Sequence, residues 1–279
     1  MLTHTFCHIP HVGPKLELQL WLNGIRSWED ALAPSHSILS PKRADHISRH
    51  IRESQSHLLA DNPYYFAAGL PSNQYWRLFP AFRAKTAYID IETTGMNGYD
   101  DHITSIALYD GSTVRCYVYD QNLYEFKDDI KQFDVIVSYN GSCFDIPFIE
   151  SFFMIKLPQV HIDLRFLLRS LGYSGGLKTV EKQIGISRGE LDGIDGFFAV
   201  LLWYEYVRNN NLDALHTMLA YNIADTVNLE RLMVFAYNRK IELTPFYADH
   251  VLPAPSEPAS PYQPHPGVVC SLTRKYYSR

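Results

Sequence analysis

The sequence predicts an α/β fold in which a mixed β-sheet is flanked by helices. The first observation is a change of apolar spacing at Thr86, where a helical period gives way to short apolar runs separated by turn residues. The second is that the later runs alternate with helical segments, as in β-α-β units. The third is a helical C-terminal half. With 46% hydrophobic and 20% charged residues, the chain has ample apolar side chains for the core of such a fold.

Residues 1–80 are predicted to form a small helical region, because their apolar residues have helical spacing. The stretch 9–15, Ile-Pro-His-Val-Gly-Pro-Lys, predicts a tight turn before a helix that stops at Gly24. The segment resembles a helix-hairpin-helix, a family of modules that present backbone amides to a DNA phosphate, with His11 in place of the first glycine of the turn. Two interpretations stay open, a phosphate-binding hairpin and a hairpin that only packs.

The sheet is predicted to begin with a three-stranded meander. Its strands are the apolar runs 87–91, 103–108 and 114–119, and Asp110-Gly111 lies in the turn between the last two. A β-α-β pattern follows, with a helix at 123–132, a strand at 135–137, a helix at 145–153 and a strand at 160–162.

Four further helices, at 164–171, 177–184, 197–208 and 212–236, complete a predicted domain at 81–244. The remaining residues, 245–279, are predicted to be a Pro-rich linker or extended tail, because closely spaced prolines cannot sustain a helix or a central strand. These prolines are Pro253, Pro255, Pro258, Pro261, Pro264 and Pro266.

Charge, cysteine usage and hydropathy limit the classes of function. A net charge of −5 argues against a protein that coats nucleic acid through charge alone, so any contact with nucleic acid is expected to be local. The four cysteines include no C-x-x-C pair, which speaks against a disulfide framework and a cysteine zinc site. No apolar run approaches the roughly 20 residues that span a bilayer, and no signal peptide is evident. We therefore predict a cytoplasmic protein with no membrane contact, and the sequence indicates no protein partner.

The first candidate site element is the pair Asp90 and Glu92 at the end of the predicted strand 87–91. Residues two apart on a strand point to the same face, so both carboxylates can meet one hard cation. The alternative is a solvated strand end with two ordinary charges.

The second element is Asp145, which follows the strand 135–137 and a turn of small residues that begins at Asn140. A carboxylate at this edge of a sheet lies where α/β sites usually form. The alternative is a helix N-terminal carboxylate that the helix dipole stabilises.

The third element is Tyr221 with Asp225 in the long helix 212–236. Residues four apart lie on one helix face, so the phenol and the carboxylate project together. The alternative is an exposed helical aspartate.

The three elements occur in the order D-x-E, N-x4-D and Y-x3-D, and together they resemble the exonuclease motifs of the DEDDy branch of the DnaQ-like, RNase H-like superfamily. The resemblance extends over residues 87–239, with Ile-Asp-Ile-Glu-Thr-Thr-Gly at 89–95 particularly close. The segment Phe6-x-His8-Ile9-Pro10-x-x-Gly13 is also similar to bacterial YprB-like exonucleases. Ala220 stands where the histidine-bearing branch has its histidine, which favours the tyrosine branch.

This resemblance implies an RNase H-like sheet and a two-metal 3′→5′ exonuclease that acts on single-stranded 3′ ends of DNA or RNA. It implies that Asp90, Glu92, Asp145 and Asp225 hold two Mg²⁺ or Mn²⁺ ions, which suit all-oxygen ligands, and that Tyr221 positions the attacking water. Candidate contacts to the substrate are Thr93, Thr94, Gly95, Asn140, Phe144 and Lys178.

Each of these candidate contacts also has a structural interpretation. The threonines and Gly95 would form a tight turn, Phe144 would fill the core, and Lys178 would share a solvated helix face with Lys182. Asp163, before the helix 164–171, is interpreted as an N-cap. Two other functions stay open: a non-catalytic nucleic-acid-binding adaptor and a structure-selective endonuclease on the same fold.

Overall fold

The computed structural model of the chain describes residues 1–33, 38–95, 101–187 and 196–277. Within them the sheet has five strands in the order β3-β2-β1-β4-β5. The strands are β1 (Thr86–Thr93), β2 (Ile103–Tyr109), β3 (Val114–Val118), β4 (Val135–Ser138) and β5 (Val160–Asp163). The first three are antiparallel, whereas β4 and β5 run parallel to β1. The predicted meander and the two later strands are thus confirmed, and the sheet is mixed, as expected.

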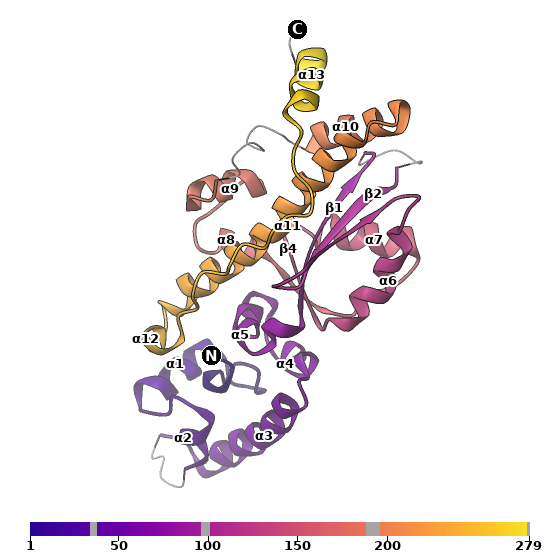
Figure 1. Ribbon diagram of the computed structural model, residues 1–279. Helices are drawn as coiled ribbons and strands as arrows, with labels where there is room; N and C mark the ends of the chain where they lie inside the picture. Colours follow the sequence, from indigo (N-terminus) through magenta and orange to yellow (C-terminus); the bar gives the residue numbers. More distant parts are fainter. Residues whose placement is uncertain (34–37, 96–100, 188–195, 278–279) are drawn as a thin grey trace.

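Strand β1 lies in the middle of the sheet and is covered on both faces (Figure 1). Ala87, Ile89 and Ile91 pack in one hydrophobic cluster with residues of α6 (Phe126–Asp129) and α7 (Asp145–Phe153). Tyr88 packs in another cluster, with residues of α11 (Leu212–Ile241). Because side chains alternate along a strand, Asp90 and Glu92 are on the face that α11 covers.

Helix α11 runs along most of the molecule, from α10 (Gly196–Asn209) at one end to α12 (Tyr247–His250) at the other (Figure 1). Helices α8 (Leu164–Arg169) and α9 (Leu177–Ile184) lie on the same side of the sheet as α11. The predicted helices 177–184 and 145–153 match the observed ones, and 212–236 extends to Ile241. The predicted helix 123–132 is instead three short turns, η4 (Leu123–Glu125), α6 and η5 (Ile130–Gln132).

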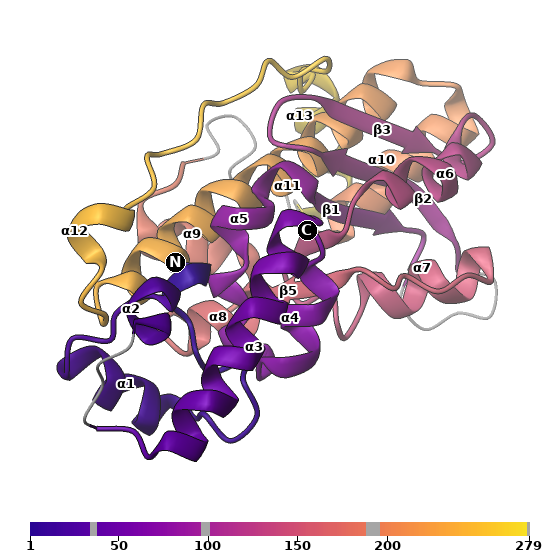
Figure 2. The same ribbon diagram turned by 90° about the horizontal axis from the view of Figure 1, so that it is seen from below.

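The N-terminal helices are packed against the β5 edge of the sheet (Figure 2). They are η1 (Leu2–His4), α1 (Pro14–Leu22), α2 (Trp28–Leu32), α3 (Pro41–Leu59), α4 (Pro63–Gly69), η2 (Ser72–Arg77), α5 (Phe79–Phe82) and η3 (Arg83–Lys85). Their apolar residues belong to the same hydrophobic cluster as Tyr88 and the buried face of α11.

The segment that resembles a helix-hairpin-helix forms the turn and the helix after it. His11 adopts φ 67° in this turn, a left-handed conformation that glycine adopts more easily. Among the described residues only the three-residue η1 precedes the turn, so the first helix of such a module is not formed there.

The Pro-rich tail differs from the prediction at its end. Residues 251–265 form no regular element, but Pro266–Tyr277 form helix α13. Val268 and Leu272 of this helix are buried in a cluster with residues of α10 and α11. Pro266 can begin a helix because its fixed φ suits the first helical position, and no proline follows it in the helix. The predicted extended tail is therefore wrong for 266–277. No helix in the described part of the chain is long and apolar enough to cross a membrane.

Candidate metal-binding site

Three carboxylates meet where β1 faces α11. Oxygen atoms of Asp90, Glu92 and Asp225 lie within 4.8 Å of one another. The first two come from β1, which the pleat places on one face, and the third comes from the middle of α11. Glu92 and Asp225 are largely buried. Buried carboxylates this close together are costly unless a cation or a proton compensates their charge.

Asp145, at the start of α7, is the fourth carboxylate at this site. It is 4% exposed, and its Oδ1 accepts a hydrogen bond of 3.3 Å from the backbone N–H of Ile91. Ile91 lies between Asp90 and Glu92 in β1, so this hydrogen bond holds the Asp145 carboxylate beside the carboxylates of those two residues.

The four carboxylates and Tyr221 line one cavity of about 430 Å³. Among the described residues, the rest of its wall is formed by Ile91, Thr93, Gly95, Tyr139, Asn140, Phe144, Gly196, Phe197 and Val200. All five residues predicted for catalysis are therefore brought together, although they come from three separate parts of the chain.

Burial and mutual repulsion dominate the electrostatics of the cavity. Burial, and then the charges of Asp225, Asp145 and Glu92, raise the pKa of Asp90 well above its usual value. Burial also raises the pKa of Asp145 to about 7, although backbone N–H groups partly oppose this. A divalent cation would reverse these shifts, because its charge favours the ionised form of each carboxylate.

The donors of this site suit a hard cation. Asp90, Glu92 and Asp225 offer only carboxylate oxygens, the ligands that Mg²⁺ and Mn²⁺ prefer, and no cysteine or histidine lines the cavity among the described residues. The residues present thus fit a divalent metal ion.

Asn222 orients Asp90, a role that the sequence analysis missed. Its Nδ2 donates to Asp90 Oδ2 at 2.7 Å and to the Asp90 carbonyl at 3.2 Å, while its Oδ1 accepts from Ser105 Oγ at 3.0 Å. The Asn222 side chain is fully buried. The signal that could have found it is the position of Asn222 between Tyr221 and the apolar Ile223, three residues before Asp225 and so near the same helix face.

The turn after β4 is held by Asp163. Its carboxylate accepts hydrogen bonds from the backbone N–H of Asn140 at 2.8 Å and of Ser142 at 3.1 Å, and from Ser142 Oγ at 2.5 Å. It also accepts from the N–H of Arg165, which confirms the predicted N-cap of α8. Asp163 thus joins the start of α8 to the turn that carries Asn140 into the cavity.

The predicted substrate contacts fall into two groups. Thr93, Gly95, Asn140 and Phe144 line the cavity. Thr94 is not among the described residues that line it, and its hydroxyl donates to Asp101 Oδ1 at 3.2 Å. The Thr93 hydroxyl donates to the Gly95 carbonyl at 2.7 Å, so both threonines also form the predicted turn.

Lys178 lies beside Tyr221 and not on a solvated face with Lys182. Its Nζ is 4.4 Å from the centroid of the Tyr221 ring, in the geometry of a cation–π interaction. Lys182, one turn later in α9, is exposed. Helix α10 also contributes to the cavity through Phe197 and Val200, which the sequence gave no reason to include.

Comparisons with known proteins identify one matching family. No curated protein matches the chain. The family B DNA polymerase from the hyperthermophilic archaeon Pyrobaculum calidifontis is similar over 56% of this chain, at 17% identity and a TM-score of 0.44. The similar part is 24% of the polymerase chain. A family model described as the RNase H superfamily matches residues 87–237, which is more than half of the sequence. The chain therefore belongs to the RNase H superfamily.

Proposed function

We propose that the protein is a metal-dependent 3′→5′ exonuclease of the DEDDy branch, which releases mononucleotides from single-stranded ends of DNA or RNA. The observation that carries the proposal is the convergence of Asp90, Glu92, Asp145, Asp225 and Tyr221 on one cavity. A structural role alone does not explain four carboxylates there, because their repulsion destabilises the folded chain.

Each residue has a role in hydrolysis that its position supports. Asp90, Glu92 and Asp225 would hold one Mg²⁺ or Mn²⁺ ion, and Asp145 with Asp90 would hold a second. Bound ions of this kind activate water and stabilise charge on both oxygens of the displacement. Asn222 keeps Asp90 oriented toward the ions through its amide hydrogen bond.

Tyr221 orients the attacking water through its hydroxyl. Because Tyr221 lies one helical turn before Asp225 in α11, its phenol is next to the metal ligands. The Lys178 ammonium lies over the Tyr221 ring, although Lys178 is not among the described residues that line the cavity, so we propose that it acts on the substrate through the phenol.

The other lining residues suit a 3′-terminal nucleotide. Thr93 and Gly95 follow the first motif at the rim, and Phe144 offers an aromatic ring on which a base can stack. Asn140, which Asp163 fixes in the turn, presents an amide to the sugar.

The segment from Phe6 to Gly13 that resembles YprB-like exonucleases packs within the N-terminal region. Phe6, His8 and Ile9 are buried, and His8 Nε2 is 2.8 Å from Ser54 Oγ. The segment therefore anchors the N-terminal helices, and we propose that it does not touch nucleic acid.

Digestion of 5′-labelled and 3′-labelled single strands in Mg²⁺ or Mn²⁺ tests the proposal. We expect a ladder that shortens from the 3′ end, no product with a chelator, and no cleavage of a circular single strand. Asp90→Asn should remove the activity and raise the thermal midpoint of the metal-free protein, because it removes one of four repelling charges. Asp128→Asn, at an exposed position, is the matched control and should change neither quantity.

Cleavage of the circle would identify an endonuclease. Binding of DNA and RNA without any hydrolysis in either metal would identify an adaptor, and either result would contradict the exonuclease.

A further inference from the structure

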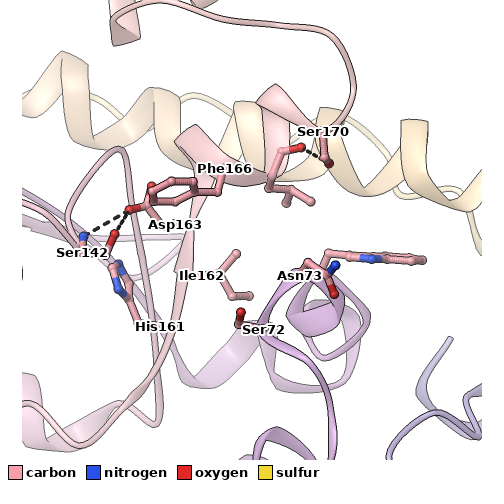
Figure 3. Close-up of a pocket in the computed structure, with 10 residues that line it drawn as sticks. Ser72, Asn73, Ser142, His161, Ile162, Asp163, Phe166 and Ser170 are labelled. Atoms are coloured by element: carbon pink, nitrogen blue, oxygen red, sulfur yellow. Dashed lines mark hydrogen bonds between the residues drawn. The ribbon is translucent and has the colours of Figure 1, made fainter. Parts of the chain in front are cut away.

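A second cavity, of about 440 Å³, lies at the β5 edge of the sheet (Figure 3). One wall comes from η2, through Ser72, Asn73 and Trp76, and the opposite wall comes from Phe166 of α8 and from Ser170, the C-cap residue of that helix. Its volume is in the range of small-ligand sites, roughly 300–1,000 Å³. The residues of η2 lie outside the segment that matches the superfamily, so this cavity is formed jointly by the N-terminal region and the RNase H-like domain.

The two cavities lie on either side of one turn. Asn140 lines the carboxylate cavity, and Ser142, two residues later, lines the second cavity. Figure 3 shows Ser142 bonded to Asp163 at the rim. Since Asp163 also binds the N–H of Asn140, the turn is a fixed wall that separates the two spaces.

The chemistry of the second cavity suits a flat, neutral, polar ring. Phe166 is 51% exposed, a high value for a large aromatic side chain, and it presents its ring at the cavity. Ser72 and Asn73 offer a hydroxyl and an amide on the other side. The Asp163 carboxylate already accepts four hydrogen bonds, so it does not require a cationic ligand.

Trp76 adds apolar ring surface to the η2 wall of the cavity. Its side chain is 3% exposed and lines the cavity, whereas its indole N–H is closed off and is not available to a ligand.

Positive charge lies on α8, the helix that carries Phe166. Arg165 and Arg169 lie four residues apart on one face of α8, and the hydrogen bond of Arg165 to Asn140 places its guanidinium at the turn between the two cavities. Both arginines are exposed, and Arg165 Nη1 donates to Asn140 Oδ1. A nucleotide whose base enters the cavity would thus have cations near its phosphate.

We propose that this cavity binds the base of an upstream nucleotide of the same single strand whose 3′ end lies in the carboxylate cavity. The base stacks on Phe166 and hydrogen-bonds to η2, while Arg165 and Arg169 contact the phosphates. The inference rests on the proposed exonuclease function, and it makes the N-terminal region part of the substrate-binding surface.

Substitution of the exposed ring tests the proposal without disturbing the core. The variants are Phe166→Ala, Phe166→Trp, which keeps a stacking surface, and Tyr247→Ala, which removes an exposed aromatic ring from α12 as a matched control. Binding of a fluorescein-labelled single strand is measured by anisotropy in Ca²⁺. Hydrolysis is measured on the same strand and on a nitrophenyl ester of a mononucleotide, which is too short to reach the second cavity.

Phe166→Ala removes one base–aromatic stack. The variant should therefore bind the strand about tenfold more weakly, and its KM for the strand should rise to a similar extent. Hydrolysis of the mononucleotide ester should not change, Phe166→Trp should retain the affinity of the wild type, and Tyr247→Ala should behave as the wild type. Equal effects of Phe166→Ala on both substrates, or none on strand binding, would overturn the proposal.

Two further results distinguish the strand subsite from the exonuclease activity itself and from a small-molecule site. If the wild type hydrolyses nothing, the exonuclease fails, but the anisotropy comparison still decides whether the strand uses Phe166. If a free nucleoside monophosphate displaces the strand from the wild type at concentrations similar to those of the strand itself, but does not displace it from Phe166→Ala, the cavity is a small-molecule site and the strand subsite is wrong.

Discussion

At the scale of single residues, the site combines ionisable groups that oppose folding when no cation is bound. Asp90 and Asp145 both have pKa values raised by burial, and neighbouring carboxylates raise the first one further. Asn222 partly offsets this by donating to Asp90. The protein thus holds preformed ligands at a cost in stability, which a bound divalent ion removes.

This cost predicts how the stability of the metal-free protein depends on pH. The pKa of Asp145 is about 7 in the folded chain and about 3.9 in an unfolded one, so the folded state binds the proton more tightly. Its stabilising contribution is therefore present below about pH 4 and is lost as the pH rises through 7. We expect the thermal midpoint without metal to fall between about pH 5 and pH 8, and to fall less in Asp145→Asn.

The stabilisation by a bound metal ion should increase with pH, whereas the stability of the metal-free protein should decrease. Because the ligands must be ionised, the rise in thermal midpoint that Mn²⁺ causes should be larger at about pH 8 than at about pH 6. An equal rise at both values would contradict the assignment of Asp145 to a metal site.

Lys178 provides a second prediction at this scale. If its ammonium acts through the Tyr221 ring, Lys178→Met should lower kcat about tenfold and leave KM within about twofold, since cation–π contacts contribute roughly 0.5–2 kcal/mol. Steady-state kinetics on a labelled strand measure both constants. Lys182→Met, at an exposed position on the same helix, is the control. A rise in KM alone would instead assign Lys178 to direct phosphate binding.

At the scale of elements, the turn between β4 and α7 lies between the two cavities. Asn140 adopts φ 65° there, and asparagine tolerates this left-handed conformation better than most residues. Gly141 follows, and a Cβ at this position would lie 2.0 Å from Ser138 Oγ, which is itself 2.8 Å from His161 Nε2. The turn therefore has room only for glycine at 141.

Gly141→Ala should displace this turn and with it Asn140 and Asp145. We expect a loss of about 1–3 kcal/mol in the free energy of unfolding, as for other overpacked positions, and at least a tenfold loss of hydrolysis. Urea denaturation and a nuclease assay measure the two effects. Gly13→Ala is the matched control, because a Cβ there meets nothing within 4 Å. Wild-type behaviour of Gly141→Ala would show that the turn can relax.

At the scale of the whole molecule, the N-terminal helices share a hydrophobic core with the RNase H-like domain. Two ion pairs reinforce this arrangement. Arg77 and Glu17 form a buried pair at 2.8 Å inside the N-terminal region, and Arg83 pairs with Glu230 of α11 at 2.7 Å. Glu17 Oε1 also accepts from the backbone N–H groups of Phe6 and Cys7.

Glu17→Ala should destabilise the entire molecule, because it leaves the Arg77 guanidinium buried without its carboxylate. We expect a loss of about 3–5 kcal/mol and a single unfolding transition, by fluorescence and by calorimetry. Glu242→Ala, which breaks the more exposed pair with Arg239, should cost less than about 1 kcal/mol. Two separate transitions would show that residues 1–80 fold as an independent domain.

Local patterns in the sequence were sufficient to predict the strands and the catalytic candidates. The two-residue spacing of Asp90 and Glu92 places both on one strand face, and the four-residue spacing of Tyr221 and Asp225 places both on one helix face. These relations depend only on backbone geometry, so they can be deduced without knowing how the chain packs. The order of the motifs then predicted the RNase H-like fold.

The tertiary structure decided which of these faces meet. Packing of α11 on β1 brings Asn222 to Asp90, and packing of α9 on α11 brings Lys178 over Tyr221; both contacts join residues far apart in the sequence. Packing also determined that 266–277 form a helix, since Val268 and Leu272 are buried against α10 and α11. For the same reason the cavity between η2 and α8 could not be deduced from either segment alone.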